Sequence, residues 1–159
     1  ANRIQEASKA AMDEAAASMT TLNRRASEIC RKYRIHACTD VTGFGFLGHL
    51  HEMMDNRYSC QVYAGQVPVM PEAVHYAEEF FLTAAAQKNR NHLEGHVRFE
   101  QISFGMEEVL FDPQTSGGLL IAASPGQAGE LLEELQEEGL PAKEVGKIME
   151  KHETEIYVL

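Results

Sequence analysis

The chain has 159 residues, 44% of them hydrophobic, which is enough for one domain with a core of its own. Because Trp is absent and aromatic residues make up only 8%, that core is expected to be mainly aliphatic. The 24 acidic and 14 basic residues give a net charge of −10, which disfavours binding to nucleic acids and to anionic membranes. An anionic ligand such as a nucleotide would therefore need local cations, and a divalent metal ion is the obvious candidate.

Cys30, Cys38 and Cys60 are widely spaced and form no Cys-x-x-Cys pair, so neither a disulfide framework nor a zinc site is expected. Three reduced, partly buried thiols in a cytoplasmic protein are the simplest interpretation. No run of about 18 apolar residues occurs, so no membrane span is expected. The first residues show neither a signal-peptide pattern nor an initiator Met, which suggests a fragment of a longer chain.

The first half of the chain predicts two helices, a strand and a third helix. One helix covers roughly the first 18–20 residues, with one face made by Ile4, Ala7, Ala11, Ala15, Met19 and Leu22. Thr20, Thr21 and Asn23 are candidate caps for the second helix. Its apolar face is expected to contain Ala26, Ile29, Cys30 and Tyr33. Residues 35–39 predict a short buried strand, and a glycine turn then leads into a helix from Phe46 to Met54.

The second half alternates between strand, turn and helix patterns. The stretch from Tyr58 to Ala64 predicts a half-buried strand, and Pro71 suits the first turn of a helix that ends near Phe80. Residues 83–103 are polar and are expected to form a long loop with a short helix. A short amphipathic piece over 107–111 follows.

Turn chemistry over 112–118 then leads into a buried strand over 119–123. A helix is expected from Ser124 to Gly139, followed by strands over 142–149 and 155–159. The apolar positions of this helix are Ala128, Leu131, Leu132 and Leu135. This mixture predicts a layered α+β domain.

Asp40 is the strongest candidate for a functional residue, because it follows the first strand and precedes the turn Gly43-Phe44-Gly45. A carboxylate is a hard oxygen ligand suited to Mg²⁺, which commonly binds one or two protein carboxylates together with substrate phosphates. The glycines allow a ligand to approach the backbone, and the next helix directs its N-terminal amides toward an anion. A purely structural alternative is that Asp40 or Thr42 caps the helix.

The segment Asp112-Pro113-Gln114-Thr115-Ser116-Gly117-Gly118 is the second candidate. Its hydroxyl and amide groups, above all those of Ser116, Gly117 and Gly118, are suited to contact a phosphate or an intermediate. The alternative is a structural turn in which Asp112 acts as an Asx-type cap and the glycines permit close packing.

Three blocks of sequence resemble the selenophosphate synthetases, also called selenide, water dikinases. They are His36-Ala37-Cys38-Thr39-Asp40-Val41-Thr42-Gly43-Phe44-Gly45-Phe46-Leu47-Gly48-His49, the segment from Asp112 to Leu120, and Met19-Thr20-Thr21-Leu22-Asn23. They occur in the family's order and spread over most of the chain. The resemblance implies that residues 1–159 are the C-terminal domain of a two-domain enzyme of the aminoimidazole ribonucleotide synthetase-like superfamily. It also implies a layered α/β/α architecture with a mixed sheet.

The resemblance further implies a reaction in which ATP, selenide and water yield selenophosphate, AMP and phosphate. Mg²⁺ is required, the active form is a homodimer, and the N-terminal domain carries the nucleophile and most metal ligands. The family's metal ligand in this domain falls on Asp40, with Thr39 and Thr42 as groups that orient it. Alternatives are another ATP-dependent synthetase or kinase of the same superfamily, and a non-catalytic interaction domain whose motifs only maintain the fold.

Other polar residues are weaker candidates. His49 and His51 are two apart on a predicted helix and make a poor metal pair, whereas His92 and His96 are four apart but lack an evident third ligand. Cys38 has no adjacent basic residue to activate it and is expected in the core.

The segment 84–91 departs from the family pattern, because alanines replace a glycine-rich turn before Asn89, Arg90 and Asn91. An anion contact by these three residues is therefore not predicted.

Overall fold

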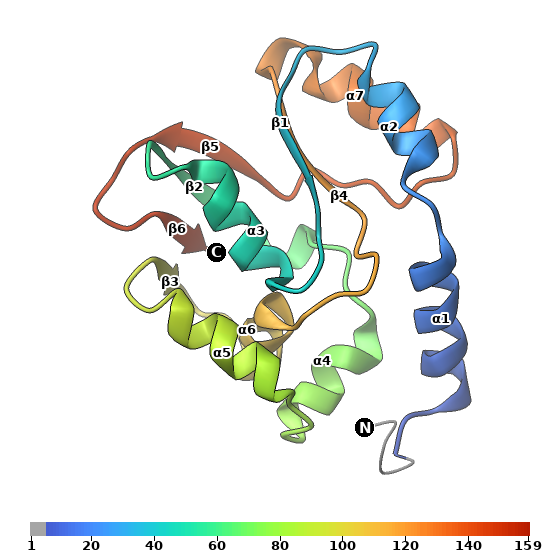
Figure 1. Ribbon diagram of the computed structural model, residues 1–159, viewed down its shortest axis with the longest axis vertical. Coiled ribbons are helices and arrows are strands. Elements are labelled where there is room, and N and C mark those ends of the chain that lie inside the picture. The colour runs from blue at the N-terminus through green and yellow to red at the C-terminus, as the bar shows by residue number, and fades with distance from the viewer. Residues whose placement is uncertain (1–5) are drawn as a thin grey trace.

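A computed structural model describes residues 6–159 (Figure 1). Its α-helices are α1 Lys9–Thr20, α2 Arg24–Cys30, α3 Gly45–Met54, α4 Pro71–Glu78, α5 Ala84–His92, α6 Phe104–Phe111 and α7 Pro125–Glu137. A short 3₁₀ helix, η2, spans Ala64–Gln66. The strands are β1 Ile35–Asp40, β2 Tyr58–Val62, β3 Val97–Phe99, β4 Leu119–Ala123, β5 Gly146–Glu150 and β6 Ile156–Val158.

The strands form two separate sheets. In the larger one, of order β3-β6-β2-β5, β6 runs parallel to both β3 and β2, while β5 is antiparallel to β2. The smaller sheet is an antiparallel ribbon of β1 and β4. The predicted α+β class with a mixed sheet is thus confirmed, and the separate ribbon is an addition that the sequence did not indicate.

The larger core lies between the four-stranded sheet and helices α3, α5 and α6 (Figure 1). Leu47, Leu50 and Met54 recur at helical spacing on α3, and their side chains are buried against the sheet. The Phe111 ring, only 2% exposed, packs edge-on against Phe99 at a centroid distance of 5.9 Å. This core holds the helical end of the predicted Asp40 segment in place.

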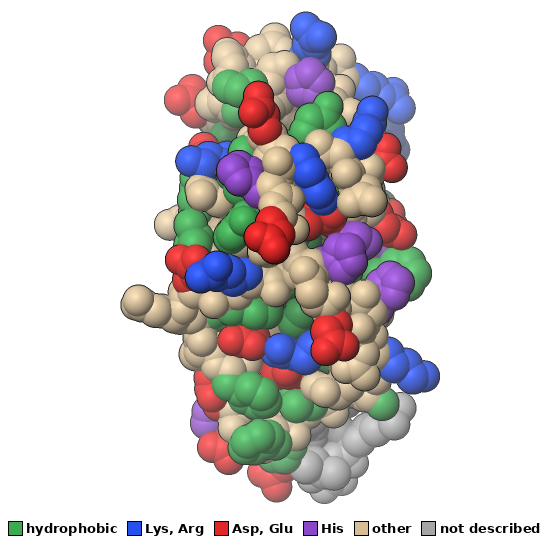
Figure 2. Space-filling view, turned by 90° about the vertical axis from the view of Figure 1, so that its left-hand side faces the viewer, with side chains coloured by type: hydrophobic (Ala, Val, Ile, Leu, Met, Phe, Trp, Pro, Cys, Tyr) green, Lys and Arg blue, Asp and Glu red, His purple; other side chains and the backbone are tan. Residues whose placement is uncertain are grey.

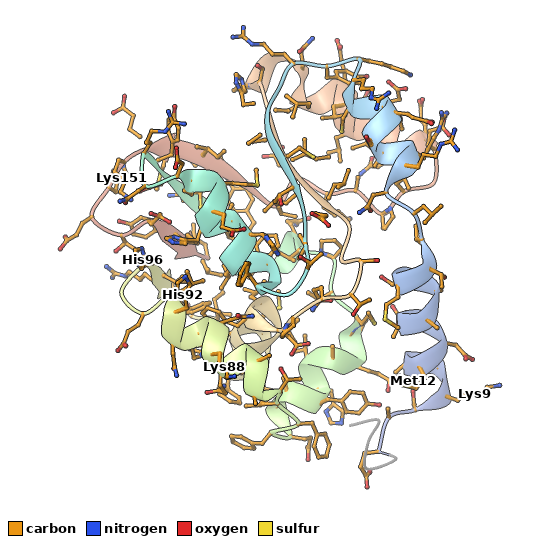
Figure 3. All side chains as sticks on the ribbon, in the orientation of Figure 1. Lys9, Met12, Lys88, His92, His96 and Lys151 are labelled. Atoms are coloured by element: carbon orange, nitrogen blue, oxygen red, sulfur yellow. The ribbon has the colours of Figure 1, made fainter. Side chains whose placement is uncertain are left out.

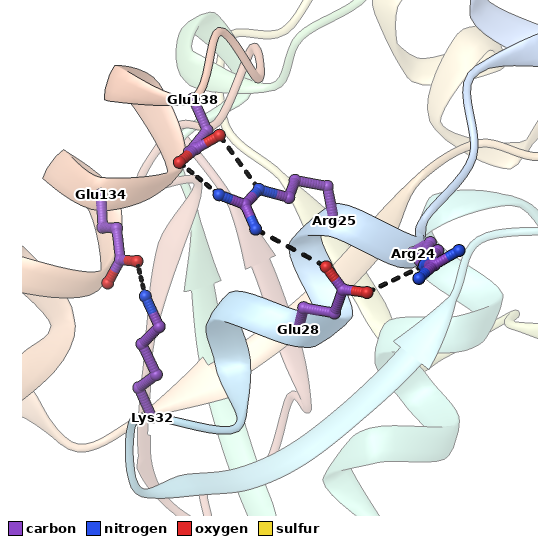
Figure 4. A network of polar contacts seen from close by, with 6 residues as sticks. All are labelled: Arg24, Arg25, Glu28, Lys32, Glu134 and Glu138. Carbon is purple, nitrogen blue, oxygen red and sulfur yellow. Dashed lines mark hydrogen bonds and ion pairs between the residues drawn. The ribbon is translucent and has the colours of Figure 1, made fainter.

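A second, smaller core joins α2 and α7 behind the β1–β4 ribbon. It buries Ile29, Cys30, Leu131 and Leu135, with Ala26 and Tyr33 packed against it, which confirms the predicted apolar face of α2. On α7 the predicted positions Leu131 and Leu135 are buried, whereas Ala128 and Leu132 are only partly buried. Ion pairs border it on the solvent side (Figure 4). Arg25 contacts Glu138 at 2.5 Å and Lys32 pairs with Glu134. Because these side chains are exposed, they add little stability compared with the apolar contacts beneath them.

Helix α1 was predicted from one apolar face, and the structure leaves Ala11 and Ala15 of that face only partly buried. None of its residues is buried, and Met19 and Leu22 at its end are 43% and 76% exposed. Ile4, the first residue of the expected face, lies outside the described residues. The helix is tied to α4 by polar contacts instead, because the Ser8 hydroxyl donates to Glu72 at 2.8 Å.

Three local expectations also differ from the structure. Of the three predicted caps of α2, only Asn23 is its N-cap, and Thr20 and Thr21 donate to carbonyls at the end of α1. Strand β1 alternates between partly buried and exposed residues instead of being buried. The short helix expected within residues 83–103 is α5, capped by the Thr83 hydroxyl, but strand β3 in the same stretch was not predicted.

Within residues 6–159, no helix combines the length and apolar character needed to cross a bilayer.

Candidate metal and phosphate site

The two candidate segments, more than 60 residues apart in the sequence, lie side by side at one end of the ribbon. Asp40 is opposite Leu119 in the antiparallel pairing of β1 and β4. The pairing continues past the strands, since the Val41 N–H donates to Gly118 O and the Gly117 N–H donates to Val41 O, both at 2.9 Å. The ribbon therefore brings Asp40 and the Ser116–Gly118 turn to the same place.

Close backbone packing explains two of the glycines in these segments. Gly45 has a φ of +70°, and a Cβ there would lie 2.7 Å from the Phe111 carbonyl oxygen. A Cβ at Gly117 would lie 2.8 Å from the Val41 carbonyl oxygen. Both positions thus require glycine for the fold. By contrast, a Cβ at Gly43 would meet no atom within 4 Å, so that side of the turn has space.

Asn89 fastens the two segments to each other. Its side-chain amide donates to Gly43 O at 3.0 Å and to Phe111 O at 2.9 Å. Thr83, which caps the same helix, donates to Asp112 Oδ1 at 2.9 Å. Helix α5 therefore acts as a brace for the site, and the Asn89 amide group is already used in this role.

The Asp40 carboxylate is exposed. Within residues 6–159 it forms neither an ion pair nor a side-chain hydrogen bond. A shallow depression surrounds it, lined by Asn23, Arg24, Ser27, Cys38, Thr39, Asp40 and Leu119. The start of α2 was not predicted as part of the site, although the Met19–Asn23 block directly precedes it and was a usable signal.

The two threonines that flank Asp40 take different partners. The Thr39 hydroxyl donates to the Asp40 main-chain oxygen at 3.3 Å, whereas the Thr42 hydroxyl is 3.1 Å from His49 Nε2. His49 is buried, and its Nδ1 is 2.9 Å from a Glu52 carboxylate oxygen. Thr42 thus connects the loop to α3. The N-cap residue of α3, Phe44, makes no side-chain hydrogen bond to the helix in the described chain. The Gly45 N–H donates to Thr42 O at 3.0 Å, so the next amides of the first turn are the ones available to an anion.

The 112–118 loop presents its hydroxyl group outward. Ser116 adopts a left-handed conformation with φ of +56°, is exposed, and has no side-chain hydrogen bond to any residue that the structure describes. The Gly117 amide and the Gly118 carbonyl are used in the pairing with Val41. Asp112 is held by Thr83, and burial raises the pKa of its carboxyl group. Ser116 is therefore the most available donor of the predicted trio.

Cys38 was expected in the core, and this is wrong, because its side chain is exposed. Partial desolvation, followed by the negative charge of Asp40, raises the pKa of its thiol. A raised pKa lowers the thiolate fraction, so Cys38 is not activated as a nucleophile. The other two thiols are buried, and all three cysteines are free.

The sequence matches the family described as AIR synthase related protein, C-terminal domain, over residues 2–159. A selenide, water dikinase from Agathobacter rectalis is 53% identical over an alignment of 159 residues. The alignment covers 99% of this chain and 46% of that protein. One from Desulfitobacterium hafniense is 41% identical over 151 residues, or 95% and 44% of the two chains. The chain thus spans less than half the length of these curated relatives.

Among solved structures, a thiamine-monophosphate kinase from Stenotrophomonas maltophilia K279a is similar in fold. The match covers 81% of this chain and 32% of the kinase chain. Its sequence identity is 16% and its TM-score is 0.48.

Proposed function

The chain belongs to the family of AIR synthase related protein C-terminal domains, and from this premise we propose that it is the C-terminal domain of a selenide, water dikinase. The full-length enzyme would convert ATP, selenide and water into selenophosphate, AMP and phosphate. The observation that carries the proposal is an exposed Asp40, whose side chain has no partner among residues 6–159, inside a sequence 53% identical to a protein of that name. This domain would form one wall of the Mg-ATP site.

Asp40 fits the role of a Mg²⁺ ligand. Its carboxylate is a hard donor and, within residues 6–159, forms no hydrogen bond or ion pair that a metal ion would have to break. Proteins commonly bind Mg²⁺ through only one or two carboxylates, and water molecules and substrate phosphates supply the other ligands. The ion would neutralise negative charge that develops during phosphoryl transfer. Further carboxylates would come from the N-terminal domain.

The groups around Asp40 would hold the phosphates. The Ser116 hydroxyl and the uncapped start of α3 are donors at the same end of the ribbon as Asp40. Thr39 and Thr42 would shape the loop that carries Asp40, Thr42 doing so through His49. Gly117 and Gly118 would set the close spacing of the two segments by their hydrogen bonds with Val41.

The proposal extends to partners outside this chain. An N-terminal domain of the same protein would supply the nucleophile and the remaining metal ligands, which is why residues 1–159 alone should not make selenophosphate. The relatives, about twice as long as this chain, support a further domain. A homodimer in the cytoplasm is part of the same proposal and is supported by the sequence resemblance.

The decisive test is whether AMP formation depends on selenide. In the purified full-length protein with ATP and Mg²⁺, we expect AMP and phosphate to accumulate several times faster with selenide than without it. ³¹P NMR should then show selenophosphate in amounts equal to AMP. If ATP is consumed with another co-substrate, and selenide changes neither rate nor products, the chain belongs to a different ATP-dependent synthetase.

A further inference from the structure

A second group of metal-binding side chains lies away from Asp40, where α3, the turn between α5 and β3, and the loop between β5 and β6 meet. It consists of His51, His96 and Glu155, each of which offers one ligand atom. These three atoms lie within 4.8 Å of one another. Figure 3 shows His96 and Lys151 along this edge of the molecule, and Figure 2 shows histidines gathered beside charged side chains on the same face.

The backbone fixes two of these residues to the four-stranded sheet. The Cys60 N–H donates to Glu155 O at 2.8 Å, and the Ile156 N–H donates to His96 O at 3.0 Å. His51 comes from the last turn of α3, which is packed on that sheet. Since folding alone brings three distant segments to this point, the ligands are positioned before any ion arrives.

The Glu155 side chain is 1% exposed, which is unusual for a carboxylate and requires compensating partners. One oxygen is 2.5 Å from His51 Nδ1, and the other is 2.8 Å from Lys151 Nζ and 4.0 Å from His96 Nδ1. In a tetrahedral zinc site, neighbouring ligand atoms are about 3.4 Å apart, given bonds of about 2.1 Å. Since the three ligand atoms lie within 4.8 Å of one another, shifts of up to about 1.5 Å would convert this cluster into a metal-binding set.

We propose that His51, His96 and Glu155 bind one divalent transition-metal ion, of which Zn²⁺ is the best match. Two imidazoles and one carboxylate are ligands that favour Zn²⁺ over Mg²⁺. The His51 and His96 side chains are 25% and 43% exposed, so the ion has a route from solvent. Binding would replace the direct contact between His51 Nδ1 and the Glu155 carboxylate and would move the Lys151 ammonium away. The ion would clamp α3 to the ends of β3 and β6.

Titration calorimetry with ZnCl₂ on the untagged protein tests the proposal. We expect about one ion per chain in the wild type, and at least about tenfold weaker binding in both His51→Gln and His96→Gln. His75→Gln serves as the matched control, because His75 is exposed on α4, and its affinity should be unchanged. Lys151→Gln should bind Zn²⁺ more tightly than the wild type, since a competing cation is removed.

Two results would overturn the proposal. One is a wild-type protein that binds no stoichiometric Zn²⁺, and the other is a His96→Gln variant that binds it as tightly as the wild type. His96 is the safest position for this test, because its side chain is partly exposed and its backbone carbonyl keeps its hydrogen bond from the Ile156 N–H. A thermal scan adds a second readout, in which Zn²⁺ should raise the melting temperature of the wild type and of His75→Gln but not of His96→Gln.

Discussion

Asp40 and Glu155 are both carboxylates beside the end of a strand, and the fold treats them in opposite ways. Asp40 ends β1, is exposed, and has no side-chain partner in the described part of the chain. Glu155 directly precedes β6, is 1% exposed, and contacts both Lys151 and His51 within 3 Å. A buried charge without partners is costly, so Glu155 must be satisfied by the protein itself. An exposed carboxylate has no such need, and Asp40 is left available for a ligand.

Substitutions at these two acidic residues should therefore be detected by different assays. Loss of Glu155 should be seen in unfolding experiments, because its partners belong to the fold. Loss of Asp40 should be seen only when substrate and metal are present.

Glu155→Ala should lower the free energy of unfolding by about 3 kcal/mol, because it leaves a cavity and removes the partner of Lys151 and His51. Asp40→Ala should change it by no more than about 0.5 kcal/mol. Urea unfolding followed by far-UV circular dichroism measures both. Equal losses in the two variants would contradict the contrast between a structural and an available carboxylate.

Gly45→Ala should cost about 2–3 kcal/mol, because the left-handed backbone disfavours a side chain and the new Cβ would meet the Phe111 carbonyl. Gly43→Ala is the matched control in the same turn, since a Cβ there has free space, and about 0.5 kcal/mol or less is expected. The same unfolding experiment distinguishes them. A Gly43 variant as unstable as the Gly45 variant would show that the packing of this turn is misassigned.

Asn89→Ala should cost about 1–2 kcal/mol, because the carbonyls of Gly43 and Phe111 lose the amide that joins them. The exposed neighbour Asn91 provides the control, and Asn91→Ala should leave the unfolding midpoint unchanged. Hydrogen exchange at Gly45 gives a local measure of the same effect. If both variants are equally stable, Asn89 does not brace the site.

Acid should weaken the protein partly through Glu155. Burial raises the pKa of this carboxyl group, but hydrogen bonds from Lys151 and His51 outweigh burial and hold the pKa below its usual value of 4.5. A lowered pKa in the folded state adds stability above the unfolded-state pKa, and this stability is lost as the pH falls through the folded value. Below pH 4.5, unfolding free energy should therefore decline more steeply in the wild type than in Glu155→Gln. Identical slopes would contradict this contribution.

Local patterns in the sequence predicted most of the fold. Helical spacing on α3 and α7 identified the buried leucines correctly, and the glycine turns marked both site segments. The sequence did not show that α1 lacks a buried face, since periodicity reports which residues share a face but not what packs against it. Strand β3 was missed because it has three residues and exists only through its pairing with β6.

The residues of the candidate site were predictable from the sequence, but their arrangement in space was not. Asp40 and the 112–118 loop stand in contiguous motifs, so each was visible by itself, whereas their adjacency depends on the β1–β4 pairing. The roles of Asn89 and Thr83 as braces were not predicted, because their partners are main-chain and side-chain groups far away in the sequence. The same holds for His51, His96 and Glu155, which come from three separate elements.

Asp40 is proposed above as a ligand of the divalent cation that accompanies ATP. The most direct measurement is the Mg²⁺ dependence of ATP consumption by the full-length protein carrying Asp40→Asn. Asp13→Asn on exposed α1 is the control for the loss of one negative charge. We expect Asp40→Asn to lower Mg²⁺-dependent consumption by about 100-fold or more at unchanged stability, and Asp13→Asn to match the wild type. Mg²⁺-dependent consumption near the wild-type rate in Asp40→Asn would contradict the account.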